Sequence, residues 1–430
     1  MSEVKIPLFP PSGTRDFYPN DMLYRNWLFG IWHKIAKSFG FSEYDAPVVE
    51  HSELYTRKDG DDILNEMFSF EKDGIKLSLR AEMTPSLSRM MINTLPTEIL
   101  PVKWYSIPQC WRYEKVTSLR KREHYQWNID IFGGEKVKSE IEIFSMIIML
   151  FKEVGLKKED VVIKVSNRLI LEKVFLKMNV KEDKIVRAFN LVDKILKLDK
   201  KEFTKMMKDE LSMSEDNVDM IYKLTELKNI KGLDQFIDKD DEVVKEMTML
   251  FNVAKEIGID EWLQFDVSVV RGLSYYTGVV FEGFCKNENI KRAICGGGRY
   301  DNLLKSYGYK EKVGACGAGF GDVVILEILN ELKLLPVLKT SIDYVIIPFN
   351  DEYFGEAHKI AKLLRDKGKI VDVYGKSGKI KIAYSYADRK NAKYVIFVAP
   401  DEWKKGEIVL KNLKESSEIK IKLDDYINQL

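Results

Sequence analysis

Residues 108–132, PQCWRYEKVTSLRKREHYQWNIDIF, form the stretch that decides the fold of this 430-residue chain. In CWRYE (110–114) and in HYQWNIDIF (124–132), polar and apolar side chains alternate with a period of two. Alternation of this kind indicates β-strands that are covered on one face only. The residues between the two strands, 115–123, include four basic side chains. We therefore expect an antiparallel hairpin with a long basic loop.

The polar face of this hairpin carries side chains suited to binding a ligand. They are Arg112, Glu114, Gln126, Asn128 and Asp130. A solvated sheet face more often mixes Lys, Thr and Glu, whereas aromatic residues flank this set. The pattern is typical of the floor of a binding site, and an exposed antiparallel sheet with paired charges fits it equally well.

Two later motifs place glycine next to residues that could bind a ligand. In VVRGLSYYTGVVFEGF (269–284), an arginine and a glycine precede two tyrosines. This order fits a turn that aims specific side chains, and it also fits a hairpin whose tyrosines pack. In ICGGGRYDNLL (294–304), three consecutive glycines allow a ligand to approach the backbone, or they form a flexible turn. The glycines at 317, 319 and 321 lack the spacing of a dinucleotide-binding fingerprint.

The overall composition is that of an ordinary globular protein. The chain is 45% hydrophobic, with 68 basic against 67 acidic residues, and its length predicts two or three domains. A nucleic-acid partner would therefore be held by a local basic patch and not by the net charge. The N-terminal residues lack an apolar leader and no segment approaches 18 continuous apolar residues, so we expect neither secretion nor membrane insertion.

The four cysteines and the four histidines are scattered along the chain, without a C-x-x-C pair. Such spacing fits neither a zinc site nor a disulfide framework. We therefore expect a reducing, cytoplasmic setting.

Changes in composition along the chain indicate its domains. From about residue 170 to 258 the sequence is free of proline and rich in Lys, Glu and Leu, which predicts several amphipathic helices. After Thr340, short apolar strands alternate with helical runs, which predicts a small α/β domain with right-handed crossovers. We expect two parts of one core, a helical insertion between them and a C-terminal domain. The expected borders are 1–168, 169–259, 260–336 and 341–430.

Taken in order, several blocks of the sequence resemble the class II aminoacyl-tRNA synthetases and, within this class, the histidyl family. The blocks are GTRDFYP (13–19), YDAPVVE (44–50, similar to motif 1), LRAEMTPSLSRM (79–90), CWRYE with REHYQWNIDIFG (110–133, motif 2), VRGLSYYTG (270–278) and CGGGRYDNLL (295–304). The resemblance covers nearly the whole chain, and the helical insertion is its least distinctive part. It implies an α+β fold with a class II antiparallel sheet core, a helical insertion and a C-terminal α/β anticodon-binding domain.

The resemblance implies a two-step reaction. L-Histidine is first activated with ATP to histidyl adenylate, and the histidyl group then passes to tRNA(His). By motif match, Arg112 and Arg271 are the catalytic arginines at the α-phosphate, where negative charge accumulates. The residues implied to bind ATP are Arg112, Glu114, His124, Arg271, Arg299 and Asp322. Mg²⁺ is expected on the ATP phosphates and not in a protein cage.

The histidine pocket and the tRNA contacts follow from the same resemblance. Neutral imidazole offers one donor and one acceptor nitrogen, so Asp130 would accept from the first while the Tyr276 hydroxyl donates to the second. The remaining residues implied to bind histidine are Glu82, Thr84, Gln126 and Tyr275. The basic loop would meet the acceptor end of tRNA through Lys115, Arg120, Lys121 and Arg122. Motif 1 builds a two-fold interface in this class, so a homodimer is expected.

One departure from the family pattern concerns motif 3. The stretch Gly319-Phe320-Gly321-Asp322 has an aspartate where most of the family has an arginine that grips the γ-phosphate of ATP. Either Arg299 takes the triphosphate, or Asp322 binds it through Mg²⁺, or ATP activation is lost. The alternative function is a non-catalytic, histidine-sensing relative, such as the regulatory subunit of ATP phosphoribosyltransferase. That subunit lacks the anticodon-binding domain, which this chain keeps in residues 341–430.

Overall fold

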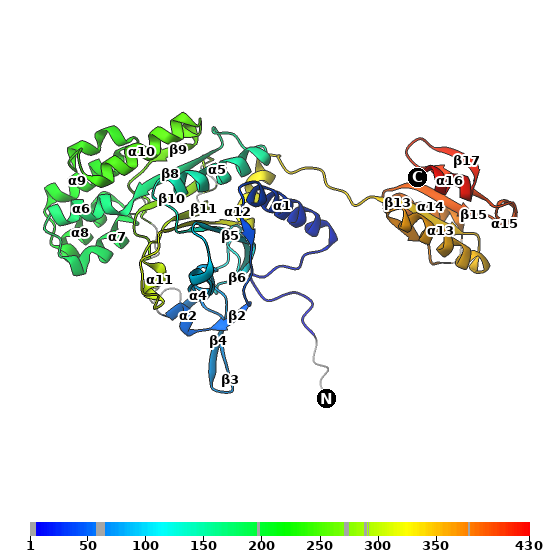
Figure 1. Ribbon diagram of the computed structural model, residues 1–430, viewed down its shortest axis with the longest axis horizontal. Helices are drawn as coiled ribbons and strands as arrows, with labels where there is room; N and C mark the ends of the chain where they lie inside the picture. Colours follow the sequence, from blue (N-terminus) through cyan, green and yellow to red (C-terminus); the bar gives the residue numbers. More distant parts are fainter. Residues whose placement is uncertain are drawn as a thin grey trace. The chain divides into compact units, whose positions relative to one another are not determined.

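A computed structural model describes residues 6–56, 65–195, 198–270, 275–287, 290, 292–376 and 379–430 (Figure 1). The chain divides into two compact units, one containing Arg25–Leu335 and the other Pro336–Leu430. Each unit has apolar cores of its own. Among the described residues, we find no helix with the length and apolar composition that a membrane crossing requires.

The first unit is built on a large mixed sheet. Its strands follow the order β1-β5-β7-β12-β11-β10-β8-β9, with β6 paired to β7. The strands are β1 (Ser42–Glu43), β5 (Val102–Ser106), β6 (Gln109–Trp111), β7 (Glu123–Phe132), β8 (Val161–Asn167), β9 (Leu263–Phe265), β10 (Val279–Cys285), β11 (Ala293–Arg299) and β12 (Ala315–Gly321). The centre is antiparallel, and only the pairs β1–β5 and β8–β9 in this sheet are parallel in the part of the chain described. This sheet confirms the predicted α+β fold.

The predicted hairpin is present, although its first strand is shorter than expected. Strand β6 pairs with β7 in the register Cys110 to His124, but it ends at Trp111 and not at Glu114. The amide of Arg112 still donates to the carbonyl of Arg122 at 2.9 Å, which continues the pairing by one residue. The amide of Tyr113 donates instead to the carbonyl of Glu66 at 2.6 Å, so the basic loop lies outside the ladder of β6 and β7.

Helices cover the apolar face of strand β7. They are α1 (Pro19–Ser38), α5 (Lys138–Glu153) and α12 (Asp322–Glu331). Trp32 of α1 stacks on Trp127 of β7 with ring centroids 6.2 Å apart, and Ile129 and Ile131 lie in the same core. Burial of such side chains contributes about 1.5–3 kcal/mol each. The even-numbered residues of β7 point to the opposite face, as the period of two predicted.

Among the described residues, five α-helices follow strand β8 and precede strand β9 (Figure 1, green). They are α6 (Arg168–Lys177), α7 (Ile185–Val192), α8 (Lys200–Leu211), α9 (Glu215–Glu226) and α10 (Glu242–Glu256). Four begin at a polar side chain that accepts a backbone N–H, and these caps are Asn167, Asp199, Ser214 and Asp241. The borders proposed from the sequence for this insertion stay predictions.

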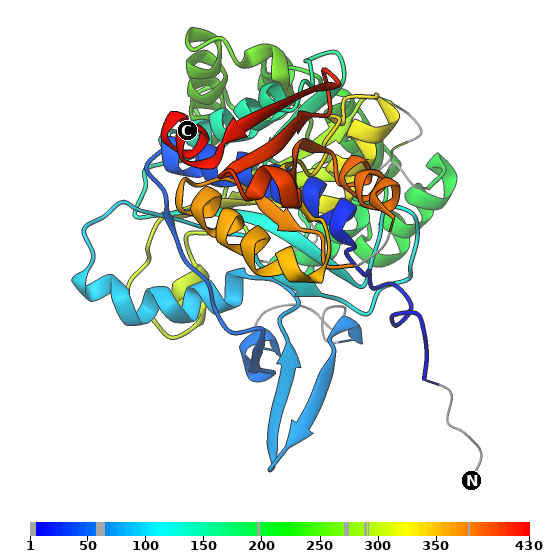
Figure 2. The same cartoon turned by 90° about the vertical axis from the view of Figure 1, so that its right-hand side faces the viewer.

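A small antiparallel sheet precedes the hairpin. It contains β2 (Val49–His51), β3 (Ser69–Lys72) and β4 (Ile75–Leu79), and helix α4 (Thr84–Thr94) follows it. Figure 2 shows the β3–β4 hairpin extending away from the rest of the first unit. The short helices α2 (Glu53–Thr56) and α11 (Leu303–Ser306) also belong to this unit.

The second unit is the predicted α/β domain. Its strands are β13 (Ile342–Pro348), β14 (Val371–Val373), β15 (Ala392–Val398), β16 (Glu407–Asn412) and β17 (Ser417–Lys422). Strands β14, β13 and β15 are parallel neighbours, connected through helices α13 (Phe354–Asp366) and α14 (Ile380–Arg389). The antiparallel strands β16 and β17 extend the sheet, a feature beyond the βαβαβ pattern expected. The helices α15 (Pro400–Trp403) and α16 (Leu423–Gln429) complete the unit.

Candidate active site

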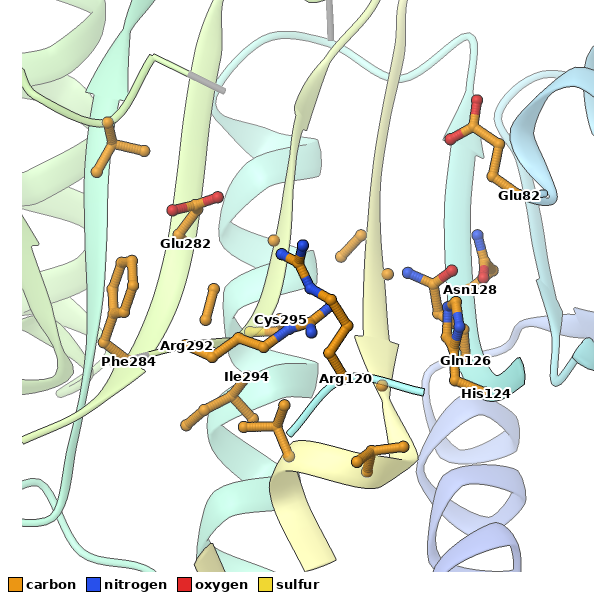
Figure 3. A pocket seen from close by; sticks show the side chains of 18 of the residues that line it. Glu82, Arg120, His124, Gln126, Asn128, Glu282, Phe284, Arg292, Ile294 and Cys295 are labelled. Carbon is orange, nitrogen blue, oxygen red and sulfur yellow. The ribbon is translucent and has the colours of Figure 1, made fainter. Parts of the chain in front are cut away.

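A cavity of about 1240 Å³ lies over the polar face of the large sheet (Figure 3). Strands β7, β10, β11 and β12, the basic loop and the start of α4 all contribute to its lining. The cavity brings together most of the residues predicted from the sequence. These are Glu82, Thr84, Arg112, Glu114, Arg120, Lys121, His124, Gln126, Asp130, Tyr275 and Tyr276.

Five predicted residues do not line the cavity or cannot be placed, and two of them, Arg299 and Asp322, are described below. Arg271 lies outside the described residues, so its role at the α-phosphate stays a prediction. Lys115 is exposed and does not line the cavity. The guanidinium of Arg122 lies over the ring of Tyr113 at 3.7 Å and donates to the carbonyl of Ser12 at 3.2 Å. The basic loop is thus divided, with only part of its charge turned toward the cavity.

Arg112 is held in place by the segment that leads into α4. Its Nε donates to the carbonyl of Ala81 at 3.0 Å. Its two terminal nitrogens lie 3.8 Å from Glu82 and 4.0 Å from Glu114. Burial acts to lower the pKa of Arg112, but these two carboxylates outweigh burial and raise it. The result is a fixed cation that stays charged and reaches into the cavity.

His124 supplies a flat, uncharged ring on the same strand face. Burial lowers its pKa to about 3, and the positive charges of Arg112, Arg292 and Arg15 act in the same direction. The imidazole is therefore neutral at physiological pH. A neutral ring suits stacking on a base and does not suit binding a phosphate.

Asp130 lies at the inner end of this strand face, where it is 3% exposed. The Tyr300 hydroxyl donates to its Oδ1. In the described part of the chain its Oδ2 has no hydrogen-bond partner. Burial raises the pKa of Asp130 to about 7, and the hydrogen bond from Tyr300 acts in the opposite direction. A buried carboxylate oxygen without a partner is costly unless a ligand supplies the donor.

Three tyrosines surround this carboxylate. The rings of Tyr275 and Tyr276 have centroids 4.8 Å apart, and the ring of Tyr300 lies 5.9 Å from the first and 6.3 Å from the second. They form an aromatic wall of a size that suits an imidazole. The predicted donation from Tyr276 to the substrate stays a prediction.

The floor of the cavity depends on glycines of strand β12. A Cβ at Gly317 would collide with Asp130 and with the Tyr300 hydroxyl. A Cβ at Gly319 would collide with the amide of Gln126. These positions therefore need glycine because side chains from β7 and from the residue after β11 lie directly over the strand.

The contacts of Arg299 lend no support to the prediction that it binds the triphosphate. Arg299 is 1% exposed and does not line the cavity. Its Nε and Nη2 donate to Glu140 at 2.6 and 3.0 Å, and Nη1 donates to Asp301 at 3.0 Å. The carbonyls of Gly134 and Glu135 accept the remaining N–H groups at 3.4 and 3.0 Å. All five donors of the guanidinium are used within the protein, so Arg299 has a structural role.

Asp322 also has partners within the protein, and these lend no support to its predicted contact with ATP through Mg²⁺. Its Oδ2 lies 3.0 Å from Nη1 of Arg15, and its Oδ1 accepts the backbone N–H of Tyr125 at 3.0 Å. Arg15 also pairs with Glu123 at 2.6 Å. Asp322 is 1% exposed and does not line the cavity. The aspartate of motif 3 therefore ties the N-terminal segment to β7.

Sequence reasoning missed three residues of this region. Tyr300 stands in the GGGRYD block, so the block itself was a signal that could have identified it. Arg292 lines the cavity just before β11, and no local pattern marked it. Arg15 stands in the GTRDFYP block, but its partners lie more than 100 residues away in sequence.

Solved structures of known proteins share this fold. Histidyl-tRNA synthetase from Nostoc sp. PCC 7120 superposes with a TM-score of 0.80 and 21% identity, covering 99% of this chain and 100% of that one. A Bacillus halodurans protein described as an ATP phosphoribosyltransferase regulatory subunit/histidyl-tRNA synthetase gives a TM-score of 0.74 at 22% identity, covering 91% and 98%. At these identities the likeness concerns the fold alone.

Sequence comparisons go further. A family model for histidyl-tRNA synthetase matches residues 13–321, and one for an anticodon binding domain matches residues 343–430. The chloroplastic/mitochondrial histidine–tRNA ligase of Arabidopsis thaliana is 42% identical over 98% of this chain and 86% of its own length. The histidine–tRNA ligase of Leptospira biflexa is 32% identical over 100% of this chain and 99% of its own. The family model covers most of this chain and the relatives match nearly all of it. The chain therefore belongs to the histidyl-tRNA synthetase family.

Proposed function

We propose that this chain is a histidine–tRNA ligase that activates L-histidine with ATP and transfers the histidyl group to tRNA(His). The observation that carries the proposal is one cavity that is lined by a buried carboxylate and by fixed arginines. The carboxylate of Asp130 has an oxygen without a partner among the described residues, and Arg112, which follows β6, is held as a cation along the same cavity.

At the histidine end, Asp130 accepts the imidazole N–H of the substrate. Tyr276 donates to the other ring nitrogen, and Tyr275 packs beside the ring. Glu82, Thr84 and Gln126 hold the ammonium and carboxylate groups of the substrate, which is supported by their position along the same cavity. A pocket of paired hydrogen bonds rejects analogues that lack the imidazole by a factor on the order of 10⁴.

At the ATP end, the substrate carboxylate attacks the α-phosphorus. The bond from that phosphorus to the bridging oxygen breaks, and pyrophosphate leaves with the electron pair. Arg112 and Arg271 stabilise the negative charge that grows on the α-phosphate, because guanidinium grips phosphate oxygens in a fixed geometry. The neutral ring of His124 stacks on the adenine, and Glu114 orients the adenine end or a metal ion.

Mg²⁺ is proposed to enter with ATP, held by the β- and γ-phosphates. The described residues contain no group of three or more His, Cys, Asp or Glu side chains placed to hold a metal ion. Glu114 fits a single ligand at the cavity edge, where its carboxylate already lies 2.7 Å from Arg120. The ion would add positive charge next to the phosphates.

For tRNA, we propose that Arg120 and Lys121 contact the acceptor end, while Lys115 and Arg122 extend this basic surface outside the cavity. Residues 341–430 bind the anticodon stem-loop. A homodimer is proposed through the motif 1 block, which is supported by the exposed apolar side chains Val48 and Val49, 43% and 41% exposed. Sedimentation of the purified chain tests this assembly.

A cytoplasmic location is also proposed. All four cysteines are free and buried, which suits a reducing compartment. Imaging of a tagged chain in its own cells tests the location, and accumulation in an organelle would contradict it.

The test of the main proposal is histidine-dependent exchange of pyrophosphate into ATP, followed by charging of tRNA(His). We expect exchange with L-histidine and none without it. Histidine binding without exchange or charging would contradict the proposal and favour the histidine-sensing relative.

A further inference from the structure

Among the described residues, three arginines line the cavity, Arg112, Arg120 and Arg292, and the family resemblance gives no role to Arg292. It lines the cavity from the residue just before β11. Figure 3 shows its side chain next to that of Arg120, on the side of the cavity opposite Glu82. The guanidinium of Arg292 is half-buried.

Arg292 has few partners within the protein. Its Nη1 donates to the carbonyl of Leu119 at 3.0 Å, the sole hydrogen bond of this guanidinium in the described part of the chain. Over the same residues, no carboxylate lies within ion-pair distance of it. Arg299, the last residue of β11, uses all five of its donors within the protein. The two arginines at opposite ends of β11 therefore differ, one structural and one with donors left for a ligand.

The surroundings of Arg292 are positively charged. Burial lowers the pKa of Arg292, and the nearby charges of Arg120 and Arg112 lower it further. The carboxylate of Glu114 acts in the opposite direction and raises this pKa. Glu114 is itself shared, because it lies 2.7 Å from Arg120 and 4.0 Å from Arg112. Glu114 thus neutralises part of the charge of Arg112 and Arg120, while Arg292 has no carboxylate within ion-pair distance among the described residues, which favours an anion beside it.

The ends of two strands place Arg292 near the position of the missing motif 3 arginine. Strands β11 and β12 are antiparallel, and Cys295 opposite Phe320 is the last pair of their register at this end. Arg292 directly precedes β11, and β12 ends at Gly321, where α12 begins with Asp322. Val323 of α12 lines the cavity, whereas Asp322 does not. A cation at 292 thus stands at the same end of the sheet, on the neighbouring strand.

We propose that Arg292 binds the β- and γ-phosphates of ATP, in place of the arginine that motif 3 lacks at position 322. This inference rests on the proposed function, in which ATP lies in this cavity with its α-phosphate at Arg112. During activation the bond between the α-phosphorus and the bridging oxygen breaks, and the released pyrophosphate gains negative charge. Arg292 stabilises that charge and the bent triphosphate before it.

The test compares full-length variants Arg292→Ala and Arg292→Lys with a matched control, Lys286→Ala. Lys286 is an exposed cation on the same β10–β11 connection and does not line the cavity. We expect Arg292→Ala to raise the KM for ATP by about 10- to 100-fold, since charge-assisted hydrogen bonds are lost. The KM for pyrophosphate in the reverse reaction should rise in parallel. Arg292→Lys should fall between wild type and Arg292→Ala, and the control should match wild type.

Two further measurements locate the effect on the terminal phosphates. Inhibition by AMP should be unchanged in Arg292→Ala, because AMP lacks the β- and γ-phosphates. The KM for histidine and the rate of transfer from preformed adenylate to tRNA should also be unchanged.

The proposal is overturned if Arg292→Ala leaves both the ATP and pyrophosphate constants within about twofold of wild type. It is also overturned if the variant slows only transfer to tRNA, or if both variants at 292 fail to fold. A wild-type chain that binds histidine but shows no exchange would contradict the proposed function instead, which separates the two failures.

Discussion

The hydroxyl of Tyr300 donates to the carboxylate of Asp130 at the inner end of the cavity, and this contact joins strand β7 to the residue after β11. The hydrogen bond occupies one carboxylate oxygen and leaves the other for a ligand. It also favours the ionised form of a carboxyl group that burial pushes toward the neutral form. Tyr300 is therefore a positioning residue for the group that we propose to recognise imidazole.

Tyr300→Phe should weaken histidine binding in a pH-dependent way. The pKa of Asp130 is about 7 with the hydrogen bond present, and removal of the donor raises it further. A larger fraction of Asp130 is then protonated at neutral pH, and fewer molecules can accept the imidazole N–H. The KM for histidine should be measured from about pH 9 down to pH 6. As the pH is lowered, it should begin to rise at a higher pH in the variant than in wild type. An unshifted profile with a uniformly raised KM would show that Tyr300 acts by packing alone.

Asp130→Asn should abolish histidine activation and yet stabilise the empty protein at alkaline pH. The pKa of Asp130 in the folded protein, about 7, exceeds the ordinary value of 3.8. Ionisation of Asp130 therefore lowers the free energy of unfolding progressively as the pH rises from about 4 to 7, and this loss is complete above pH 7. The full difference is at most about 4 kcal/mol. Urea unfolding at pH 5 and pH 8 measures it. Equal effects of the substitution at both pH values would contradict the raised pKa.

Gly317→Ala should impair histidine binding while the protein still folds. The added Cβ meets Asp130 and the Tyr300 hydroxyl, so those side chains must move away from their hydrogen-bonded positions. We expect the KM for histidine to rise by about tenfold or more, the effect of losing one good hydrogen bond to a charged group.

Gly321→Ala is the control for this substitution. It lies on the same strand, a Cβ there meets nothing within 4 Å, and its φ of −85° suits alanine. Because Gly321 also lines the cavity, the control is read by the KM for histidine alone, which should match wild type. An equal rise in the KM for histidine in both variants would mean that the backbone geometry of β12 tolerates no side chain at either position.

The pair Arg15 and Asp322 should show coupling in a double-mutant cycle. Asp322 is almost fully buried and has Arg15 at 3.0 Å, so removal of Arg15 alone leaves a buried charge. Each single alanine variant should cost several kcal/mol, about 3–5, and the double variant should cost clearly less than the sum. Urea unfolding of the four proteins gives the coupling energy, and additive effects would show that the two charges are independent.

Much of this site could be predicted because strand β7 carries its pattern locally. The alternation in 124–132 identified the core face with Trp127 and Ile129 and the cavity face with Gln126 and Asp130. That inference needs only the period of a strand and one covered face. The class II sheet followed from the order of the motif blocks.

The remainder could not be predicted because it depends on pairings between distant segments. Asp322 looked like a defect of motif 3, since its partner Arg15 lies 307 residues earlier in the sequence. Arg299 looked like an available cation, since Glu140 comes from a helix 159 residues away. Arg292 gained meaning only from its place in the cavity, at the end of the sheet where β12 gives way to α12.

The pairing of Arg15 with Asp322 limits which residues these two positions can hold. An arginine at position 322 would place two guanidiniums in a buried site that holds one cation and one anion. Removal of Arg15 alone would leave Asp322 as a buried acid without its cation. Because each single change is destabilising, positions 15 and 322 can be exchanged only together.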